Sequence, residues 1–201
     1  IAGAFAFYPN KQMTTGEGGV VVTDDEEIYL LCRSMRNQGR GVAENWLEHV
    51  RLGYNFRMDE LSAALGVEQV KKLDVFIRKR NTVAERYAKL LAGVEGVRAP
   101  VIAPFTTRVS WFVYVVTLAE GIDRDRLIVY LQERGVQSRN YFTPIHLQPF
   151  YKERFGYREG MLPITENLSK RTLAIPFYNN LTEEDQEYVV HSLKEGIERF
   201  S

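Results

Sequence analysis

The sequence predicts a protein in two parts that combines α/β and α+β architecture. Short runs of aromatic and β-branched residues, which are typical of strands, alternate with runs whose apolar residues recur at helical spacing. One long helical tract, from about residue 59 to 91, separates two such regions. We therefore expect a strand-and-helix portion of a larger domain over residues 1–75 and a smaller α+β domain over residues 76–201.

The first part is expected to begin with two strands and a helix. Apart from Ala6, Phe5–Tyr8 and Val20–Thr23 are aromatic or β-branched, and the turn between them, residues 14–19, contains three glycines. Thr23 is the predicted N-cap of the helix, because acidic residues follow it in the first turn. A polar loop is then expected up to about residue 52. The expected buried side chains of the helix are Ile28, Leu31, Cys32 and Met35.

The long tract that follows is predicted to be helical. A coiled coil is disfavoured, because clean heptads are missing and the small residues 63–66 suit close packing within a globule. The charged stretch 72–80 predicts a break in the helix and the boundary between the two parts. The apolar residues at helical spacing include Leu61, Leu65, Val70, Leu73, Ile77, Ala84, Tyr87 and Leu91.

The second part is expected to alternate strands and helices. Gly135 is the predicted stop of its first helix, and prolines and glycines make residues 144–163 an expected loop. Thr182 resembles the start of a capping box that opens the last helix. The predicted strands are 111–118, 136–142 and 174–178, and the predicted helices are 123–134, 168–173 and the one after Thr182.

Composition and charge exclude several classes of protein. The 26 basic and 26 acidic side chains cancel, so no strong field favours a nucleic acid or a membrane surface. Cys32 is the only cysteine, which excludes an intrachain disulfide and a zinc site built of cysteines and favours a reducing cytoplasm. Nucleotide-binding glycine loops and metal-ligand spacings are missing. The start, Ile1–Ala4, has no initiator methionine and no signal-peptide character, so we expect the sequence to begin inside a longer protein.

One lysine is distinguished by its setting. Lys11 lies between the two predicted strands, close to the glycine-rich turn, and so is carried on a short connection rather than on a solvated helix. A lysine amine held in this way is a candidate Schiff-base nucleophile. The alternative is a surface lysine whose stem lies along apolar groups with its amine in water, which is the usual case.

Three segments resemble the motifs of one enzyme family. The run FYPNK at 7–11, followed by GEGG at 16–19, closely resembles the active-site lysine motif of the DegT/DnrJ/EryC1/StrS aminotransferases. The runs GYNFRM at 53–58 and YxxPxHxxPxY at 141–151 are similar to two further motifs of that family. The resemblance extends over nearly the whole chain. It implies the C-terminal portion of a fold type I aminotransferase, with a remnant of the large cofactor-binding domain followed by the small domain.

The resemblance also implies an activity. Family members use pyridoxal 5'-phosphate to convert a nucleotide-linked keto-sugar to an amino sugar, and glutamate is the expected amino donor. Lys11 would form the Schiff base with the cofactor and transfer a proton. Relatives that dehydrate keto-sugars have a histidine in place of this lysine, so Lys11 favours transamination. The expected setting is polysaccharide or secondary-metabolite sugar biosynthesis by a homodimer with shared active sites, without nucleic acid, membrane or metal.

The second motif supplies two cofactor-binding candidates. The resemblance implies that Asn55 reaches the cofactor phosphate of the neighbouring subunit. An amide NH₂ and the helix N-terminus expected at Asp59 both favour a phosphate, whereas by position alone Asn55 could equally cap or turn the chain. Arg57 is a candidate because a guanidinium binds phosphate bidentately, and its alternative is a solvated or ion-paired surface role.

The third motif supplies two substrate-binding candidates, His146 and Tyr151. The resemblance places this segment near the sugar-nucleotide site, where aromatic rings can stack on a sugar or base and a histidine offers a polar contact. The alternative is a structured proline loop whose aromatic side chains fill the domain core. No functional role is predicted for His49 or His191.

The sequence differs from the family pattern at one residue, and it does not include the segment that carries two other family residues. Many members have a phosphate-binding serine five residues before the lysine, where this chain has Ala6. The family's carboxylate for the pyridine nitrogen and its ring-stacking residue belong to a segment before the lysine motif that this sequence does not contain. Two other functions therefore stay open: a regulatory or sensory member of the same fold that lost turnover, and a non-catalytic interaction domain. An acidic residue roughly two dozen positions before Lys11 would favour the enzyme.

Overall fold

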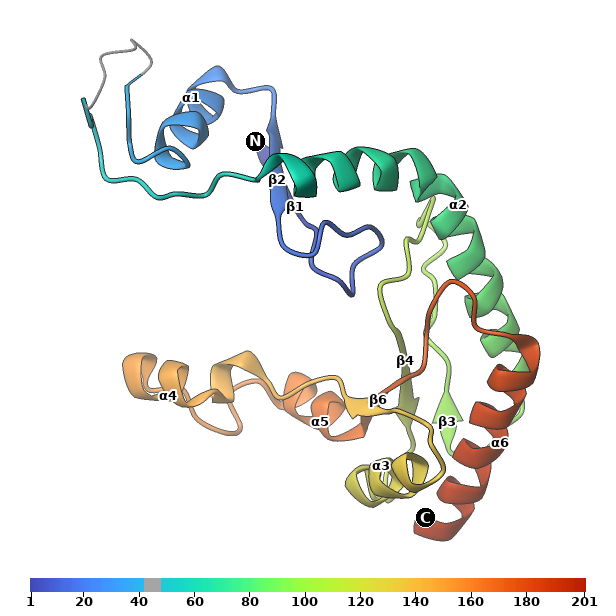
Figure 1. Cartoon of the computed structure of the whole chain (residues 1–201). Coiled ribbons are helices and arrows are strands. Elements are labelled where there is room, and N and C mark those ends of the chain that lie inside the picture. The colour runs from blue at the N-terminus through green and yellow to red at the C-terminus, as the bar shows by residue number, and fades with distance from the viewer. Residues whose placement is uncertain (42–47) are drawn as a thin grey trace. The chain divides into compact units, whose positions relative to one another are not determined.

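The computed structural model describes residues 1–41 and 48–201, and the chain divides into two compact units, Ile1–Val75 and Phe76–Ser201 (Figure 1). Residues 42–47 belong to the predicted polar loop and lie outside the described residues. Each unit has a sheet of its own, with two strands in the first and four in the second.

The first unit begins with an antiparallel hairpin. Strand β1 (Ala2–Ala6) pairs with β2 (Gly19–Thr23), so that Ala2 lies opposite Thr23 and Ala6 opposite Gly19. The first strand therefore starts and ends earlier than the predicted 5–8. The reason is that Phe7 already belongs to the following loop, where its N–H donates to the Gly18 carbonyl and its own carbonyl accepts from Thr15.

Helix α1 (Glu26–Met35) follows the hairpin, and its predicted N-cap was wrong by two residues. Asp25 caps the helix, because its Oδ1 accepts from the N–H groups of Glu27 and Ile28 at 2.9 and 3.1 Å. Thr23 instead accepts from the Asp25 N–H through its hydroxyl. An aspartate is as good a cap as threonine, and its position next to the first turn decides the choice. The predicted stripe is half-buried at Ile28, Leu31 and Cys32, but Met35 is exposed.

Helix α2 (Glu60–Leu90) is continuous, so the predicted break at residues 72–80 is wrong. That stretch contains neither glycine nor proline, and lysine and arginine are good helix formers whose charges stay in water. The two units nevertheless divide within this helix, between Val75 and Phe76. The C-terminal half of α2 contributes Ile77, Val83, Ala84 and Tyr87 to the buried interior of the second unit.

The second unit is built on a four-stranded antiparallel sheet with the order β3-β4-β6-β5. The core joins its central strands to one side of α2 and to α3 and α6. Its largest fully buried side chains include Tyr87, Tyr114, Leu118, Leu127, Leu131, Leu173 and Leu193. The elements are β3 (Val97–Arg98), β4 (Tyr114–Leu118), α3 (Arg124–Glu133), β5 (Arg139–Asn140), β6 (Thr172–Ile175) and α6 (Glu183–Phe200).

Two predicted strands of this unit are shorter than expected. The strand predicted from residue 111 starts only at Tyr114, because Trp111 has a left-handed φ of 48°, which a strand does not allow. The strand predicted over 136–142 pairs only at Arg139 and Asn140, opposite the short strand β6. The prediction for α3 is confirmed, including the left-handed Gly135 that follows it.

The predicted loop 144–163 contains helical structure. It holds the 3-10 turn η1 (Ile145–Leu147) and helix α4 (Pro149–Phe155), and α5 (Pro163–Arg171) starts five residues before the predicted Leu168. The prolines that predicted a loop instead occupy the first positions of α4 and α5, where a proline needs no N–H partner. Gly156, at φ 67°, ends α4.

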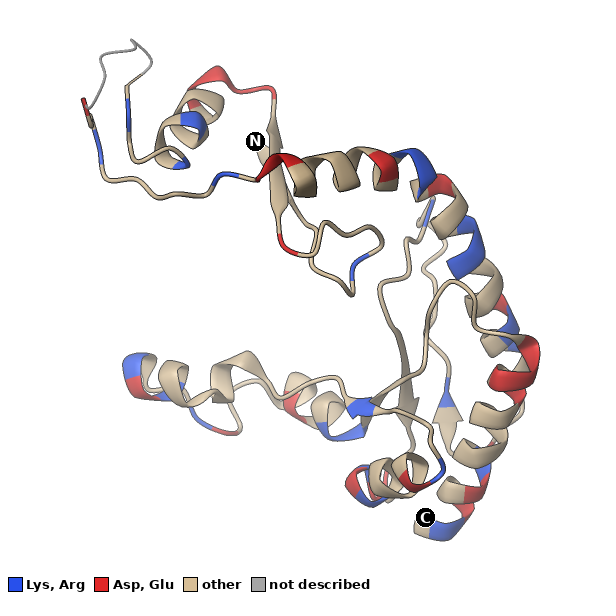
Figure 2. Cartoon of the chain, viewed as in Figure 1, with Lys and Arg blue, Asp and Glu red and all other residues tan. Residues whose placement is uncertain are grey.

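The predicted start of the last helix is confirmed. The Thr182 hydroxyl accepts from the Asp185 N–H at 3.1 Å and donates to the Asp185 carboxylate at 2.6 Å. Lysine, arginine, aspartate and glutamate residues are interspersed along α2 and α6 (Figure 2). None of the helices in the described part of the chain has the length and apolarity that a membrane span requires.

Thr182→Ala is expected to lower the free energy of unfolding by about 1 kcal/mol, because the Asp185 N–H loses its acceptor at the start of α6. Urea denaturation of the full-length protein measures the change. Thr182→Ser keeps the hydroxyl and is the matched control. A serine variant as unstable as the alanine variant would show that the threonine methyl group, rather than the cap, is what matters.

Candidate functional site

Lys11 lies on a loop, residues 7–18, that leaves the β1–β2 hairpin and is closed at its base by hydrogen bonds. The Phe7 N–H donates to the Gly18 carbonyl at 2.9 Å, and the Phe7 carbonyl accepts from the Thr15 N–H at 3.0 Å and the Thr14 hydroxyl at 2.9 Å. The Lys11 N–H donates to the Tyr8 carbonyl at 3.0 Å, which makes a tight turn at the lysine itself. The lysine is half-buried on this closed loop.

The same loop is fixed to the N-terminal half of α2. Met13 and Thr15 are buried, and the Thr14 N–H donates to the Gln69 side chain at 3.3 Å. A Cβ added to Gly66 would lie 3.0 Å from the Thr15 side chain, so the small-residue face predicted over 63–66 receives the loop. The backbone around Lys11 is therefore held both at its base and along one side.

Asn55 lies on an extended segment that is hydrogen-bonded to the end of α1. The Tyr54 N–H donates to the Met35 carbonyl at 2.6 Å, and the Tyr54 carbonyl accepts from the Gln38 N–H at 2.8 Å. A Cβ added to Gly53 would lie 2.0 Å from the Gly39 nitrogen, so the two backbones touch here. Asn55 itself is exposed, and within the described part of the chain no hydrogen bond to its side chain is formed.

Arg57 and Asp59 carry interactions that change their predicted roles. Arg57 is exposed, and its Nη1 donates to the Asn37 side chain at 2.9 Å, so part of the guanidinium is engaged within the unit. Asp59 caps α2 with its own carboxylate, which accepts from the N–H and hydroxyl of Ser62. These bonds lower the pKa of Asp59. Since an anion already caps this helix, the argument that its N-terminus favours a phosphate fails, and the Asn55 amide is the remaining donor.

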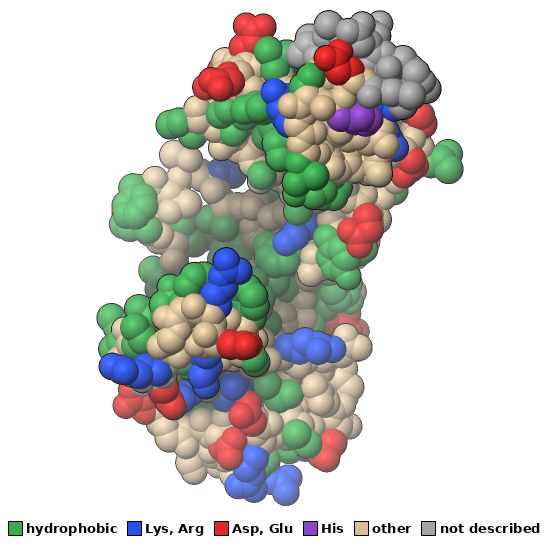
Figure 3. Space-filling view, turned by 90° about the vertical axis from the view of Figure 1, so that its left-hand side faces the viewer, with side chains coloured by type: hydrophobic (Ala, Val, Ile, Leu, Met, Phe, Trp, Pro, Cys, Tyr) green, Lys and Arg blue, Asp and Glu red, His purple; other side chains and the backbone are tan. Residues whose placement is uncertain are grey.

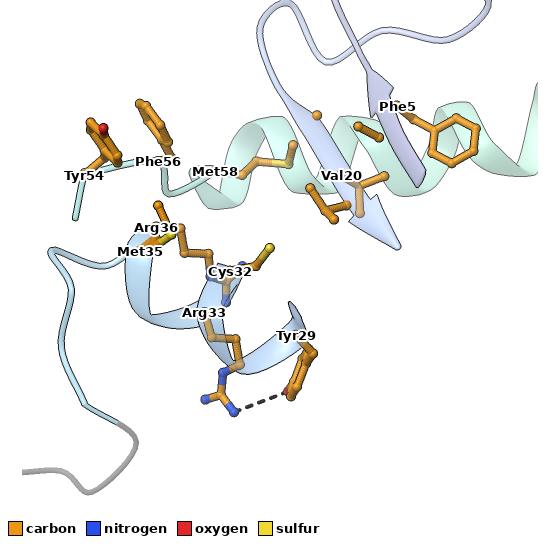
Figure 4. Close-up of a pocket in the computed structure, with 13 residues that line it drawn as sticks. Phe5, Val20, Tyr29, Cys32, Arg33, Met35, Arg36, Tyr54, Phe56 and Met58 are labelled. Atoms are coloured by element: carbon orange, nitrogen blue, oxygen red, sulfur yellow. Dashed lines mark hydrogen bonds between the residues drawn. The ribbon is translucent and has the colours of Figure 1, made fainter. Parts of the chain in front are cut away.

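Lys11 and Asn55 lie on two different segments of the first unit. In Figure 1 the loop 7–18 hangs from the hairpin, whereas the segment that carries Asn55 runs from the end of α1 toward the start of α2. A groove of about 810 Å³ lies beside that segment (Figure 4). Its lining is largely apolar and includes Phe5, Val20, Cys32, Tyr54, Phe56 and Met58, with Tyr54 and Phe56 stacked at 4.7 Å.

In the second unit, His146 is buried in η1 and paired with a residue that the sequence did not indicate. Its Nε2 lies 2.9 Å from Oε1 of Glu166. The same carboxylate also accepts from the N–H groups of Gly160 and Leu162. The Gly160 N–H, His146 and the Leu162 N–H together lower the pKa of Glu166. A glutamate in the first turn of a helix that begins with proline was the available sequence signal.

Tyr151 lies on α4, and the interpretation that the aromatic residues of this segment fill the domain core is wrong. No residue of α4 is buried, and Figure 3 shows hydrophobic side chains at the surface over this helix. Tyr151 contacts Phe150 edge-on and Phe155 at a tilt, with ring centroids 5.5 and 5.8 Å apart. Arg154 lies over the Phe150 and Phe155 rings. The row of rings is thus available to a partner or a ligand.

The family model for the DegT/DnrJ/EryC1/StrS aminotransferases matches residues 1–194. The chain belongs to this family. It is 33% identical to the spore coat polysaccharide biosynthesis protein SpsC of Bacillus subtilis, over 98% of this chain and 54% of that protein. It is 32% identical to the GDP-perosamine synthase of Escherichia coli O157:H7, over 95% of this chain and 50% of that protein.

A solved structure gives the same answer for the fold. S. venezuelae DesV, crystallised in complex with a ketimine intermediate, superposes with a TM-score of 0.88 at 32% identity, over 100% of this chain and 52% of that one. The fold class is therefore that of part of a fold type I aminotransferase, as predicted. The chain spans about half the length of the relatives it matches. The described residues contain no group of three or more histidine, cysteine or carboxylate side chains placed to bind a metal ion.

Proposed function

We propose that this chain is the C-terminal portion of a pyridoxal-phosphate-dependent aminotransferase that converts a nucleotide-linked keto-sugar to an amino sugar, with glutamate as donor. The observation that carries this proposal is the Lys11 loop, which is closed at its base and fixed to α2. Such a loop holds the backbone that carries the Lys11 amine in one place, which favours imine chemistry at that amine. Membership in a family of sugar aminotransferases supports it.

The residues present fit pyridoxal phosphate in the chemistry of their side chains. Lys11 supplies an amine for the aldehyde, and Asn55 and Arg57 supply N–H donors for a phosphate, of which the Asn55 amide is not engaged by any described residue. When bound, this cofactor supplies an electron sink for a carbanion. Lys11 would hold the cofactor covalently, and its Nζ would then take up and return the proton that moves during amino transfer.

The separation of Lys11 from the Asn55 segment supports a homodimer. Within one chain the loop and the segment extend in different directions, so one subunit would supply the lysine and the other the amide to a shared site. His146 and Tyr151 are the proposed contacts to the nucleotide-sugar, the histidine as a polar contact and the tyrosine as a stacking ring. The free Cys32 suits a cytoplasmic enzyme of polysaccharide or secondary-metabolite sugar synthesis.

Reduction with borohydride tests the proposal. The full-length protein is incubated with pyridoxal phosphate, reduced and digested, and we expect the phosphopyridoxyl group on the peptide that contains Lys11. An unreduced sample is the control for non-covalent retention. Labelling on a different lysine would refute the assignment of Lys11. Labelling of Lys11 without amino transfer to any nucleotide-linked keto-sugar would favour a regulatory or sensory member of the fold.

A further inference from the structure

Glu166, in the first turn of α5, is a buried carboxylate of the second unit that accepts several hydrogen bonds. The residue is 6% exposed, and three donors from three places in the chain converge on it. Oε2 accepts from the Gly160 N–H at 2.8 Å, and Oε1 accepts from the Leu162 N–H at 3.0 Å and from His146 Nε2 at 2.9 Å. A carboxylate with several N–H partners is stabilised in its charged form.

These contacts decide which nitrogen of His146 carries the proton. An ionised carboxylate only accepts hydrogen bonds, so Nε2 of His146 must be the donor in the 2.9 Å contact. In the neutral imidazole Nδ1 is then an acceptor, and it is the nitrogen left for another partner. Glu166 therefore sets the orientation of the His146 ring and makes its Nδ1 a hydrogen-bond acceptor.

Glu166 also closes the segment 146–162, which we call the arm. His146 stands at the start of the arm, and Gly160 and Leu162 stand at its end, and all three bind the same carboxylate. Helix α4 lies between these ends with no buried residue, and Figure 1 shows it projecting from the rest of the unit. Since little burial fixes the arm, its position depends on the hydrogen bonds at its base.

We propose that Glu166 is a positioning residue for nucleotide-sugar binding. It holds His146 in the Nε2–H tautomer with Nδ1 free to accept from the substrate, and it anchors the arm that carries Tyr151. This inference rests on the proposed function for its substrate, but the tautomer and the anchoring follow from the contacts of this chain alone.

Kinetics of Glu166→Gln in the full-length protein give the first test. Glutamine keeps the size of the side chain but turns one acceptor oxygen into a donor, so it cannot accept all three N–H groups. We expect the KM for the nucleotide-sugar to rise about tenfold, with kcat within about twofold and the KM for the amino donor unchanged. Glu159→Gln is the matched control, because Glu159 is exposed, lies on the same arm and pairs with the exposed Lys170. A fall in kcat with unchanged KM would overturn the proposal.

A double-mutant cycle separates positioning from general support of the fold. If Glu166 acts through His146, His146→Asn combined with Glu166→Gln should raise the KM for the nucleotide-sugar by less than the product of the two single effects. Effects that multiply would show that Glu166 does not act through His146, and would overturn the proposal.

A spectroscopic test needs no activity. The protein has three histidines, so ¹⁵N imidazole shifts of the labelled full-length protein at about pH 8 can be assigned with His146→Asn. We expect Nε2–H for His146 in the wild type and a mixture of tautomers in Glu166→Gln. An Nδ1–H tautomer in the wild type, or no change in the variant, would refute the positioning role. If no nucleotide-sugar is aminated, the proposed function fails, and this measurement still decides the role of Glu166.

Discussion

Lys11→Ala is expected to reduce the rate of amino transfer roughly 10⁴-fold, because it removes both the covalent attachment of the cofactor and the group that carries the proton. The loop itself should persist in the variant, since backbone groups of Phe7, Thr15 and Gly18 close it at its base. The loss should therefore appear in kcat with an unchanged thermal unfolding midpoint. The measurement is steady-state production of amino sugar by the full-length enzyme.

Two controls separate the chemistry of Lys11 from its charge. Lys11→Arg keeps a positive charge on the same loop but has no nucleophilic amine, so it should lose as much activity as the alanine variant. Lys71→Ala removes an exposed lysine of the same unit, paired with Glu68 on α2, and should leave the rate within about twofold. An arginine variant with near-normal activity would mean that Lys11 contributes only electrostatically.

The spacing of apolar residues predicts where helices form better than it predicts which of their side chains are buried. The apolar residues Leu61, Leu65 and Val70 correctly indicated the first half of α2, yet all three are exposed in this chain. Helical spacing of apolar residues shows that one face of the helix is apolar. It does not show whether another part of the chain packs against that face. The second half of α2 carries the same pattern and is buried against β4 and α6, so there the pattern predicted the core as well.

In the candidate site, features set by neighbouring residues could be predicted, but contacts between residues far apart in the sequence could not. The setting of Lys11 is local, because strand, turn and glycines adjoin it in sequence, and it could be predicted. The pairing of His146 with Glu166 joins residues twenty positions apart through a turn, α4 and a further loop. By sequence alone the prolines at 149 and 163 favour a loop, whereas both start helices, so the sequence predicts neither the fold of the arm nor this contact.

Gly53→Ala is expected to displace the segment that carries Asn55. The new Cβ would lie 2.0 Å from the Gly39 nitrogen and 2.4 Å from the Gln38 carbonyl carbon. Both are backbone atoms, and Gln38 and Gly39 already have left-handed φ angles of 61° and 73°, so this turn has little freedom to move away. The segment must shift instead, at a cost of about 1–3 kcal/mol in the free energy of unfolding.

The displacement should weaken cofactor binding more than it weakens the fold. The hydrogen bonds from Tyr54 to Met35 and from Gln38 to Tyr54 fix the residue before Asn55, and a shifted segment cannot keep both. If Asn55 binds the cofactor phosphate, the Kd for pyridoxal phosphate, measured from its absorbance, should rise about tenfold. Gly93→Ala is the control, since it strains a left-handed glycine at φ 82° by about 1 kcal/mol but meets no atom within 4 Å. It should lower stability and leave the Kd unchanged. A Gly53→Ala protein that binds the cofactor as tightly as the wild type would remove Asn55 from the phosphate site.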